Sequence, residues 1–582
     1  MTNDAIRQKA EAYVAMEENA HFADEIKTLL AQENWEELSD RFWRDLDFGT
    51  GGLRGVIGGG DNRINPRVIR KATQGLANYI LTRVPQGERG VAIAYDSRLY
   101  SDLFAQEAAR VLAANGIKVW LFTSLRPTPV LSFAVRQLGA CAGIMVTASH
   151  NPAIYNGYKV FWEDGAQVVP PHDSGIISEV RQVSGDVPAL DVQEAQEKGL
   201  IIPIDKEIDE PYQAMVVSQA LNLPLIKEKG KDLKLVYTPL HGTGLVPVEN
   251  VMAELGIPVT TVPEQRDPDG NFPTAPYPNP EMAPALELAL KLAKEKDADL
   301  VMATDPDADR LGIAVPDGED WVLVTGNQLG ALLTDYIFRT QKEAGSLPAH
   351  PAFVNTIVTS LFQNRIAESY GAESFRVLTG FKYIGEKIRQ FEAEGDKTYI
   401  FGGEESYGFL VGSAVRDKDA VSAAAMTAEM ALWNRSRGKS VMDHLRELYG
   451  KFGFWKETLI SREFEGQKGV ETMDALMASL RQDPPKSIGE DEVVALRDYR
   501  EGSTTHLTDG TVAKDIHLPS SNVLQFEFSD GGMVTARPSG TEPKIKFYAS
   551  LCGNGEGAAQ KVEERIATIE QWVGERINAL NA

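Results

Sequence analysis

One segment of the sequence carries a carboxylate at every second position. In DPDADR these are Asp305, Asp307 and Asp309. An extended or turning loop can direct alternate side chains to one point, and hard oxygen ligands suit Mg²⁺ or Ca²⁺. A calcium-binding EF-hand would need Gly and Glu where this chain has Arg310 and Pro316, so magnesium is favoured. The alternative, a solvated acidic loop, would leave three carboxylates repelling one another.

A second polar loop, TASHNP, follows the apolar run CAGIMV. Ser149 stands between Ala148 and His150, and Asn151-Pro152 prevents the strand from continuing. We expect the serine to be exposed at the strand end. A plain turn remains an alternative, because Ser and Asn are ordinary turn residues. A Ser-His-Asp hydrolase is disfavoured, because the G-x-S-x-G elbow is absent around Ser149.

The segment GGEESYG contains two adjacent carboxylates, Glu404 and Glu405. Adjacent residues of an extended chain point in opposite directions, so a glycosidase-like pair flanking one bond is disfavoured. One acceptor together with the Ser406 hydroxyl suits hydrogen bonding to sugar hydroxyls instead. A surface turn is the competing interpretation.

The segment RPSGTEPK is basic within a chain of formal charge −24. Guanidinium, hydroxyl and loop N–H groups together form a cradle for a phosphate. A turn with incidental cations is the alternative. The groups that would form the cradle are Arg537, Ser539, Gly540, Thr541 and Lys544.

Three similar units of alternating strands and helices position the first three loops. The expected strands are 90–98, 117–122 and 141–146, then 234–244, 257–262 and 298–304, then 352–358, 374–380 and 398–401. Such patterns predict parallel or mixed sheets covered on both faces. Ligands of open α/β sheets bind beyond the carboxyl ends of the strands. The three loops should therefore lie at equivalent ends of three domains, which could face one cleft.

The two ends of the chain differ from these units. Apolar residues at helical spacing predict helices near 6–14 and 35–43. The segment 47–60 holds seven glycines around Arg54 and is expected to be a loop. Residues 522–550 alternate apolar and polar residues around Asp530-Gly531, which predicts an antiparallel hairpin, followed by a helix near 562–573. A fourth, α+β domain is expected here.

Composition limits the function. The chain has 59 basic and 83 acidic residues among 582, which argues against nucleic-acid binding. Two cysteines, Cys141 and Cys552, form neither a disulfide framework nor a zinc motif, so a reducing cytoplasm is expected. The charged first twenty residues and the lack of a long apolar run predict neither a signal peptide nor a membrane span.

With TASHNP, DPDADR, GEESYG and RPSGTEPK in this order, the sequence resembles the α-D-phosphohexomutase superfamily of phosphoglucomutases and phosphomannomutases. FGTGGLRG and the N-terminal helices look most like the larger bacterial phosphoglucomutases and the related phosphopentomutase and glucose 1,6-bisphosphate synthase branch. The resemblance implies four domains around a central cleft. The expected division is a helical extension at 1–40, α/β domains at 41–208, 209–324 and 325–455, and an α+β phosphate-binding domain at 456–582.

The resemblance also implies residue roles. Ser149 matches the serine that is phosphorylated, and this phosphoserine completes the Mg²⁺ ligands Asp305, Asp307 and Asp309. Lys159 and Lys418 match candidates for acid/base work, while His150 and His241 match family histidines. Further contacts to the sugar and its phosphate are implied for Arg54, Arg310, Lys382, Glu404, Ser406, Arg537, Ser539, Gly540 and Thr541.

The activity implied is interconversion of glucose 1-phosphate and glucose 6-phosphate through glucose 1,6-bisphosphate. Phosphoryl transfer needs charge neutralisation and in-line positioning, which a metal beside phosphoserine and surrounding cations would supply. Rivals with the same chemistry are phosphopentomutase, phosphomannomutase and bisphosphate synthase, and a more distant rival is a non-catalytic sugar-phosphate-binding protein. The sequence leaves open whether the protein is a monomer or a homodimer.

Overall fold

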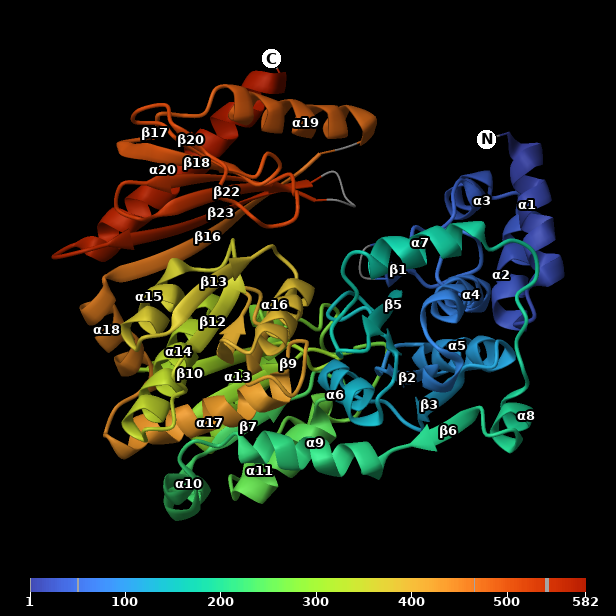
Figure 1. Ribbon diagram of the computed structural model, residues 1–582, viewed down its shortest axis with the longest axis horizontal. Helices are drawn as coiled ribbons and strands as arrows, with labels where there is room; N and C mark the ends of the chain where they lie inside the picture. Colours follow the sequence, from blue (N-terminus) through green and yellow to red (C-terminus); the bar gives the residue numbers. More distant parts are fainter. Residues whose placement is uncertain (1, 50–51, 465, 540–543, 582) are drawn as a thin grey trace.

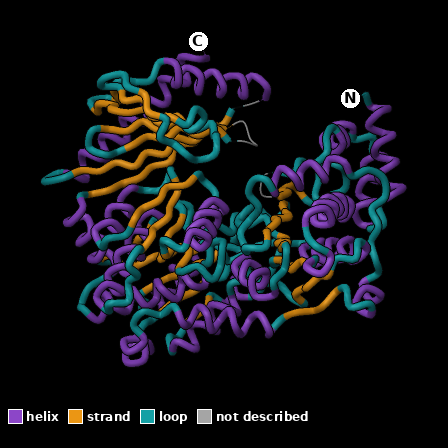
Figure 2. Tube along the Cα trace, in the orientation of Figure 1, coloured by secondary structure: helices purple, strands orange, loops and turns teal. Residues whose placement is uncertain are grey.

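The computed structural model describes residues 2–49, 52–464, 466–539 and 544–581. Four sheets follow one another along the described chain (Figure 1), and each marks one domain. Figure 2 shows that helices accompany the strands of each domain. The first three domains are α/β and the fourth is an antiparallel sheet with helices, as the sequence predicted.

Three helices precede the first sheet: α1 (Asn3–Met16), α2 (Ala20–Ala31) and α3 (Trp35–Phe42). Side-chain caps start α2 and α3, where Asn19 and Asn34 accept from backbone N–H groups. The helices share a small core that includes Tyr13, Ile26 and Phe42. They cover the side of the first domain that lies away from the C-terminal sheet (Figure 1). The sequence predicted α1 and α3 and missed α2.

The first domain has a six-stranded mixed sheet in the order β1-β5-β4-β2-β3-β6. Its central strands confirm the predicted unit. The strands are β1 (Gly52–Val56), β2 (Gly90–Tyr95), β3 (Lys118–Phe122), β4 (Ala142–Val146), β5 (Tyr155–Trp162) and β6 (Ile201–Ile204). The helices are α4 (Pro66–Arg83), α5 (Ser101–Ala114), α6 (Thr128–Leu138), α7 (His172–Gln182) and α8 (Val192–Glu197).

The glycine-rich segment is not only a loop, because it contains the edge strand β1, antiparallel to β5. Gly52 has φ +130°, and a Cβ there would lie 1.8 Å from the Tyr158 carbonyl oxygen. The glycine therefore permits a close approach of two backbones that a larger residue would prevent. Sequence periodicity could not reveal this strand, since four of the fourteen residues in 47–60 are apolar side chains and seven are glycines.

The second domain has a five-stranded sheet in the order β11-β10-β9-β7-β8. Its strands are β7 (Leu235–Thr238), β8 (Val259–Thr261), β9 (Leu300–Thr304), β10 (Leu311–Asp317) and β11 (Asp320–Val324). Its helices are α9 (Lys206–Ser218), α10 (Leu223–Lys229), α11 (Leu245–Leu255), α12 (Pro263–Arg266) and α13 (Ala283–Lys296). Strands β7, β8 and β9 are parallel, and β10 and β11 return antiparallel.

The third domain has a four-stranded sheet in the order β13-β12-β14-β15. Its strands are β12 (Pro351–Thr356), β13 (Glu373–Val377), β14 (Thr398–Gly403) and β15 (Phe409–Val411). Its helices are α14 (Gly326–Glu343), α15 (Leu361–Ser369), α16 (Phe381–Glu394), α17 (Ala420–Ser436) and α18 (Val441–Phe452). The three strands predicted for this unit are confirmed as β12, β13 and β14.

The C-terminal domain has an antiparallel sheet in the order β16-β23-β22-β21-β18-β19-β20, with β17 paired to β18. The strands are β16 (Phe454–Glu463), β17 (Ser487–Ile488), β18 (Asp491–Asp498), β19 (Ser503–His506), β20 (Val512–Ala513), β21 (Leu524–Phe528), β22 (Met533–Pro538) and β23 (Lys544–Gly553). Helices α19 (Gly466–Gln482) and α20 (Ala558–Asn581) pack on it. The predicted hairpin is β21–β22.

One hydrophobic core joins the first three domains. It extends from Phe122 and Phe161 through Tyr237 and Leu300 to Phe353, with many further residues of all three. The C-terminal sheet has a separate core on its helical side. A smaller cluster, with Ile357 and Leu378 from the third domain and Tyr499, Val523 and Tyr548 from the fourth, links the C-terminal domain to the first three. Trp455 and Cys552 of the C-terminal sheet also pack into the core of the first three domains.

Candidate active site

Each of the three polar loops follows the predicted strand of its domain and contains a residue in the left-handed backbone region. These residues are Ser149 after β4 (φ 52°), Ala308 after β9 (φ 48°) and Tyr407 after β14 (φ 65°). Non-glycine residues are uncommon there, and such strain clusters at functional sites. Tertiary contacts must therefore hold all three loops in place.

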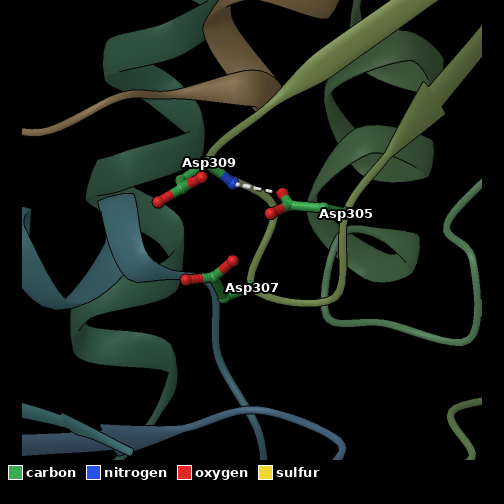
Figure 3. Close-up of side chains that lie close together, drawn as sticks. All are labelled: Asp305, Asp307 and Asp309. Atoms are coloured by element: carbon green, nitrogen blue, oxygen red, sulfur yellow. Dashed lines mark hydrogen bonds between the residues drawn. The ribbon is translucent and has the colours of Figure 1, made fainter. Parts of the chain in front are cut away.

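The three aspartates of the second domain converge on one space (Figure 3), and their ligand atoms lie within 4.8 Å of one another. All three are buried. Asp305 Oδ1 accepts from the backbone N–H groups of Asp309, at 3.1 Å, and Arg310, at 3.0 Å. Burial and the two neighbouring carboxylates raise the pKa of Asp305 well above its usual range. A cation at this point would relieve that repulsion.

The carboxylates fit a metal ion in a second respect. Asp307 Oδ1 and Asp309 Oδ1 are buried and have no hydrogen-bond partner among the residues that the structure describes. An unpaired buried carboxylate oxygen is costly unless something binds it. Three convergent carboxylates with two unused oxygens are a donor set suited to a hard divalent cation.

Ser149 lies against this trio: its hydroxyl Oγ donates to Asp305 Oδ2 at 2.8 Å. The serine is 3% exposed, so the expectation of an exposed side chain was wrong. The aspartate loop of the second domain covers it, which no local pattern in TASHNP could reveal. The imidazole Nδ1 of His150 is 3.3 Å from the same Oγ. Burial and the nearby Arg310 and Arg54 guanidinium groups lower the pKa of His150 well below its usual range, so the ring is neutral near pH 7.

Two lysines contact the trio from other domains. Lys159 Nζ, on β5, lies 2.8 Å from Asp307 Oδ2, and Lys418 Nζ, from the third domain, lies 3.0 Å from Asp309 Oδ2. Burial opposes both charges, but the surrounding aspartates raise the pKa of each ammonium above its usual value. Lys159 in turn lowers the pKa of the Asp307 carboxyl, against the effect of burial. Both lysines are therefore protonated at neutral pH.

Three cations that were expected to contact phosphate lie in different parts of the structure. Arg54 Nη1 donates to Asn151 Oδ1 at 3.3 Å, beside the serine loop. Arg310 Nη1 donates to Glu281 Oε1 at 2.9 Å. Lys382 Nζ is 3.6 Å from Asp173 Oδ2, so it faces the first domain.

In the third-domain loop, Glu404 Oε1 accepts from the Gly380 N–H at 2.9 Å, and burial raises the pKa of its carboxyl. Ser406 follows on the same loop and is partly buried. The ring nitrogens of His241 instead contact Asp267 O, at 3.1 Å, and Thr274 Oγ1, at 2.9 Å. This histidine is thus engaged within the second domain.

The expected phosphate cradle follows β22 of the C-terminal sheet. Arg537 lies in β22, and the Ser539 N–H donates to the Lys544 carbonyl oxygen at 2.7 Å across the loop. The expected positions Gly540 and Thr541 lie outside the described residues. The expected cradle thus belongs to the C-terminal domain, whereas the Ser149 loop belongs to the first domain.

Sequence reasoning missed Arg98, which shapes the serine loop. Its guanidinium donates to the carbonyl oxygens of Ser149, Asn151, Pro152 and Tyr155. Its Nε lies 3.4 Å from Asp96 Oδ2, and both side chains are 0% exposed. Asp96 also accepts from the Thr147 hydroxyl, whose oxygen caps the Ser149 N–H. The available signal was a charged pair, Asp-Ser-Arg, directly after a buried strand.

Thr128, at the start of α6, was also missed. Its N–H donates to the Asp307 carbonyl oxygen at 2.9 Å, and its hydroxyl donates to Asp307 Oδ2 at 2.8 Å. The first domain therefore holds the aspartate loop of the second. Asp417, beside Lys418, is a further missed carboxylate and lies 2.9 Å from that ammonium.

A buried serine hydroxyl beside three carboxylates that suit a divalent cation, with protonated lysines around them, is an arrangement suited to phosphoryl transfer. Known sequence families agree. Residues 45–185, 210–318 and 325–452 match the α/β/α domains I, II and III of phosphoglucomutase/phosphomannomutase. The chain belongs to this family and is a mutase.

Several relatives match nearly the whole chain. A phosphoglucomutase of Staphylococcus epidermidis is 37% identical over 93% of this chain and 97% of its own. A human phosphopentomutase is 35% identical over 97% of this chain and 95% of its own. The fold resembles that of parafusin, a phosphoglucomutase from Paramecium in an open form, with TM-score 0.66, 18% identity and coverage of 90% and 94%. None of the described helices is long and apolar enough to cross a bilayer.

Proposed function

We propose that the protein interconverts glucose 1-phosphate and glucose 6-phosphate through a phosphorylated Ser149 and a glucose 1,6-bisphosphate intermediate. The observation that carries the proposal is the 2.8 Å contact between Ser149 Oγ and Asp305 Oδ2, across two domains. The choice of glucose rests on the phosphoglucomutase relative at 37% identity and on the GEESYG loop.

Mg²⁺ is the proposed cofactor, held by Asp305, Asp307, Asp309 and an oxygen on Ser149. When bound, it would neutralise charge on the phosphoryl group. Everything else in the site is supplied by the chain. Thr128 and Lys159 fix Asp307, and Arg310 and Lys418 flank Asp309.

The reaction breaks the bond between phosphorus and the Ser149 oxygen and forms a bond to the 6-hydroxyl oxygen of glucose 1-phosphate. The bisphosphate then turns over and returns its other phosphoryl group to Ser149. The two protonated lysines, Lys159 and Lys418, are the candidates to give a proton to the departing oxygen. Neutral His150, 3.3 Å from Ser149 Oγ, is the candidate to accept one.

The remaining assignments concern the sugar phosphate. Arg54 and Lys382 are proposed as phosphate contacts, and Glu404 and Ser406 as readers of the sugar hydroxyls. Arg537, Ser539, Gly540 and Thr541 would hold the phosphate that is not transferred. Because glucose 1,6-bisphosphate can bind with either its 1-phosphate or its 6-phosphate in this cradle, the cradle must accept both glucose 1-phosphate and glucose 6-phosphate.

The domain division at 40, 208, 324 and 455 is proposed with this mechanism. We propose that the protein binds sugar phosphates and binds neither nucleic acid nor a membrane. For the oligomeric state, the monomer and the homodimer both remain open. Two free, buried cysteines support a reducing, cytoplasmic location.

The first test is Ser149→Ala, analysed by intact mass and mutase assay. We expect loss of the phosphate and of turnover, with sugar-phosphate binding retained. Substantial residual turnover would overturn the phosphoserine assignment, and a wild-type protein that binds sugar phosphate without turning it over would be the non-catalytic alternative.

The second test compares glucose 1-phosphate, mannose 1-phosphate and ribose 1-phosphate side by side. The human phosphopentomutase at 35% identity makes ribose 1-phosphate the strongest competitor. We expect the highest kcat/KM with glucose 1-phosphate. A strong preference for ribose would replace the glucose assignment and leave the phosphoserine chemistry intact.

A further inference from the structure

A cavity of about 450 Å³ lies between the third domain and the C-terminal domain. One wall comes from β13 and one face of α16, and the other from β18 and residues 515–519. Its volume is within the range of small-molecule sites. None of its lining residues is among those expected to contact metal or substrate.

The wall contains an arginine, Arg376, for which the described part of the chain supplies no carboxylate partner. Arg376 Nη2 donates to the Ile357 carbonyl oxygen at 2.6 Å. Its Nε is buried and has no partner within the described parts of the chain, which also show no ion pair for this side chain. Burial lowers the pKa of Arg376, yet a guanidinium stays charged in proteins. Arg376 also lines the cavity and is partly exposed, so its guanidinium group presents a positive charge to the pocket.

The cavity is lined by three cations, Arg376, Lys387 and Arg497, and by two carboxylates, Glu386 and Asp515, which leaves an excess of one positive charge. Lys387 donates to the Gln390 amide at 3.1 Å, with its Nζ 5.0 Å from the Phe375 ring. Arg497 is paired with Glu527, while Asp515 accepts from a threonine. The carboxylate of Glu386 lies 3.9 Å from Arg389. Arg376 and Lys387 are thus the cations available to a ligand.

We propose that this junction cavity binds a small organic anion, whose carboxylate or phosphate group contacts Arg376 and Lys387 and whose flat apolar part packs on Phe375 and Tyr499. A planar guanidinium group matches the oxygens of either anion. Aromatic walls suit a ring or short chain beside the charge.

Because the cavity lies between two domains, a bound ligand would affect their relative arrangement. Arg376 Nη2 also contacts Met533 Sδ, at the start of β22, and Arg537 lies further along the same strand. A ligand that bridges both walls would therefore favour this arrangement of the third and C-terminal domains. By linkage, it would change the affinity of the phosphate loop for its ligand. The inference rests on the cavity and not on the proposed substrate.

The test is isothermal titration calorimetry of the full chain with phenylphosphonate and with benzoate. Benzyl alcohol serves as the neutral control. We expect saturable binding of at least one anion, and none of the alcohol. Binding of phenylphosphonate alone would assign a phosphate-type ligand, and binding of both a general anion site. Absence of saturable binding for both anions overturns the proposal.

Variants locate the anion. Arg376→Met should weaken binding about tenfold or more, through loss of a charge-assisted bond. The control Arg500→Met, at an exposed arginine of the C-terminal domain, should leave it unchanged. Binding that persists in Arg376→Met but is lost in Arg537→Met would place the anion at the phosphate loop and overturn the proposal. If circular dichroism shows Arg376→Met unfolded, Lys387→Gln decides: weakened binding supports the site, and unchanged binding refutes it.

Discussion

Arg98→Met tests whether one guanidinium holds the serine loop in its left-handed conformation. In the native protein this group bonds four carbonyl oxygens of residues 149–155 and lies 3.4 Å from Asp96 Oδ2. Methionine keeps an unbranched, flexible side chain and removes every donor. Because neither side chain is exposed, the substitution leaves the Asp96 carboxylate buried without its cation.

Removing one partner of a buried ion pair costs ~3–5 kcal/mol. If ~3 kcal/mol of this is lost from the closed state of the loop, opening becomes about a hundredfold more frequent, at 1.4 kcal/mol per factor of ten. Amide hydrogen exchange of peptides covering 147–157, followed by mass spectrometry, measures this directly. Exchange should accelerate about a hundredfold there and mutase activity should fall with it.

The control is Arg83→Met, which removes an exposed arginine of the same domain that lies over the Tyr79 ring. We expect its loop exchange to match wild type. Equal exchange in Arg98→Met and Arg83→Met would refute the reasoning, because other contacts would then be sufficient to hold Ser149.

Three further predictions concern the phosphate loop, pH and the metal. Arg537→Met should raise KM for the sugar phosphate, because each lost charge-assisted hydrogen bond costs ~1.5–3 kcal/mol of binding free energy. An unchanged KM in steady-state assays would contradict the proposed phosphate cradle. Burial raises the pKa of Glu457 to about 7 from an ordinary 4.5, so the folded state retains a proton that the unfolded chain releases. The free energy of unfolding should therefore fall as pH rises from 4.5 to 7, by at most ~1.4 kcal/mol per pH unit. Glu457→Gln should flatten this dependence in urea titrations, and an unaltered slope would contradict the assignment. Asp309→Asn should weaken Mg²⁺ binding in calorimetry while Asp320→Asn, at an exposed position, should not; equal isotherms would argue against the trio as the metal site.

The sequence predicted the parts of the site that depend on local pattern. Buried strands followed by polar loops placed Ser149, Asp305 and Glu404 at strand ends, and alternate spacing identified the aspartate trio. These features can be predicted because strand periodicity and loop composition are determined by a few neighbouring residues. The RPSGTEPK segment was expected between two strands; β22 ends at Pro538 and β23 begins at Lys544, while residues 540–543 lie outside the described residues.

What the sequence could not supply depends on contacts between distant segments. The burial of Ser149 results from the second domain, 156 positions away in Asp305. The support from Arg98 and Thr128 likewise requires the fold, since a lone arginine or threonine has no spacing signal. The strand β1 was missed because glycines, which permit its close approach to β5, are typical of turns.

The division of the hydrophobic interior has a consequence for how specificity could change during evolution. The serine, the aspartates and both lysines stand on a scaffold whose interior is shared by three domains, whereas Arg537 stands on a sheet with an interior of its own. If Arg537 holds the non-reacting end of the substrate as proposed, replacements in the C-terminal sheet would reshape its recognition without repacking the groups around Ser149. New sugar phosphates could thus be adopted by exchanging the last quarter of the chain while the chemistry is inherited unaltered.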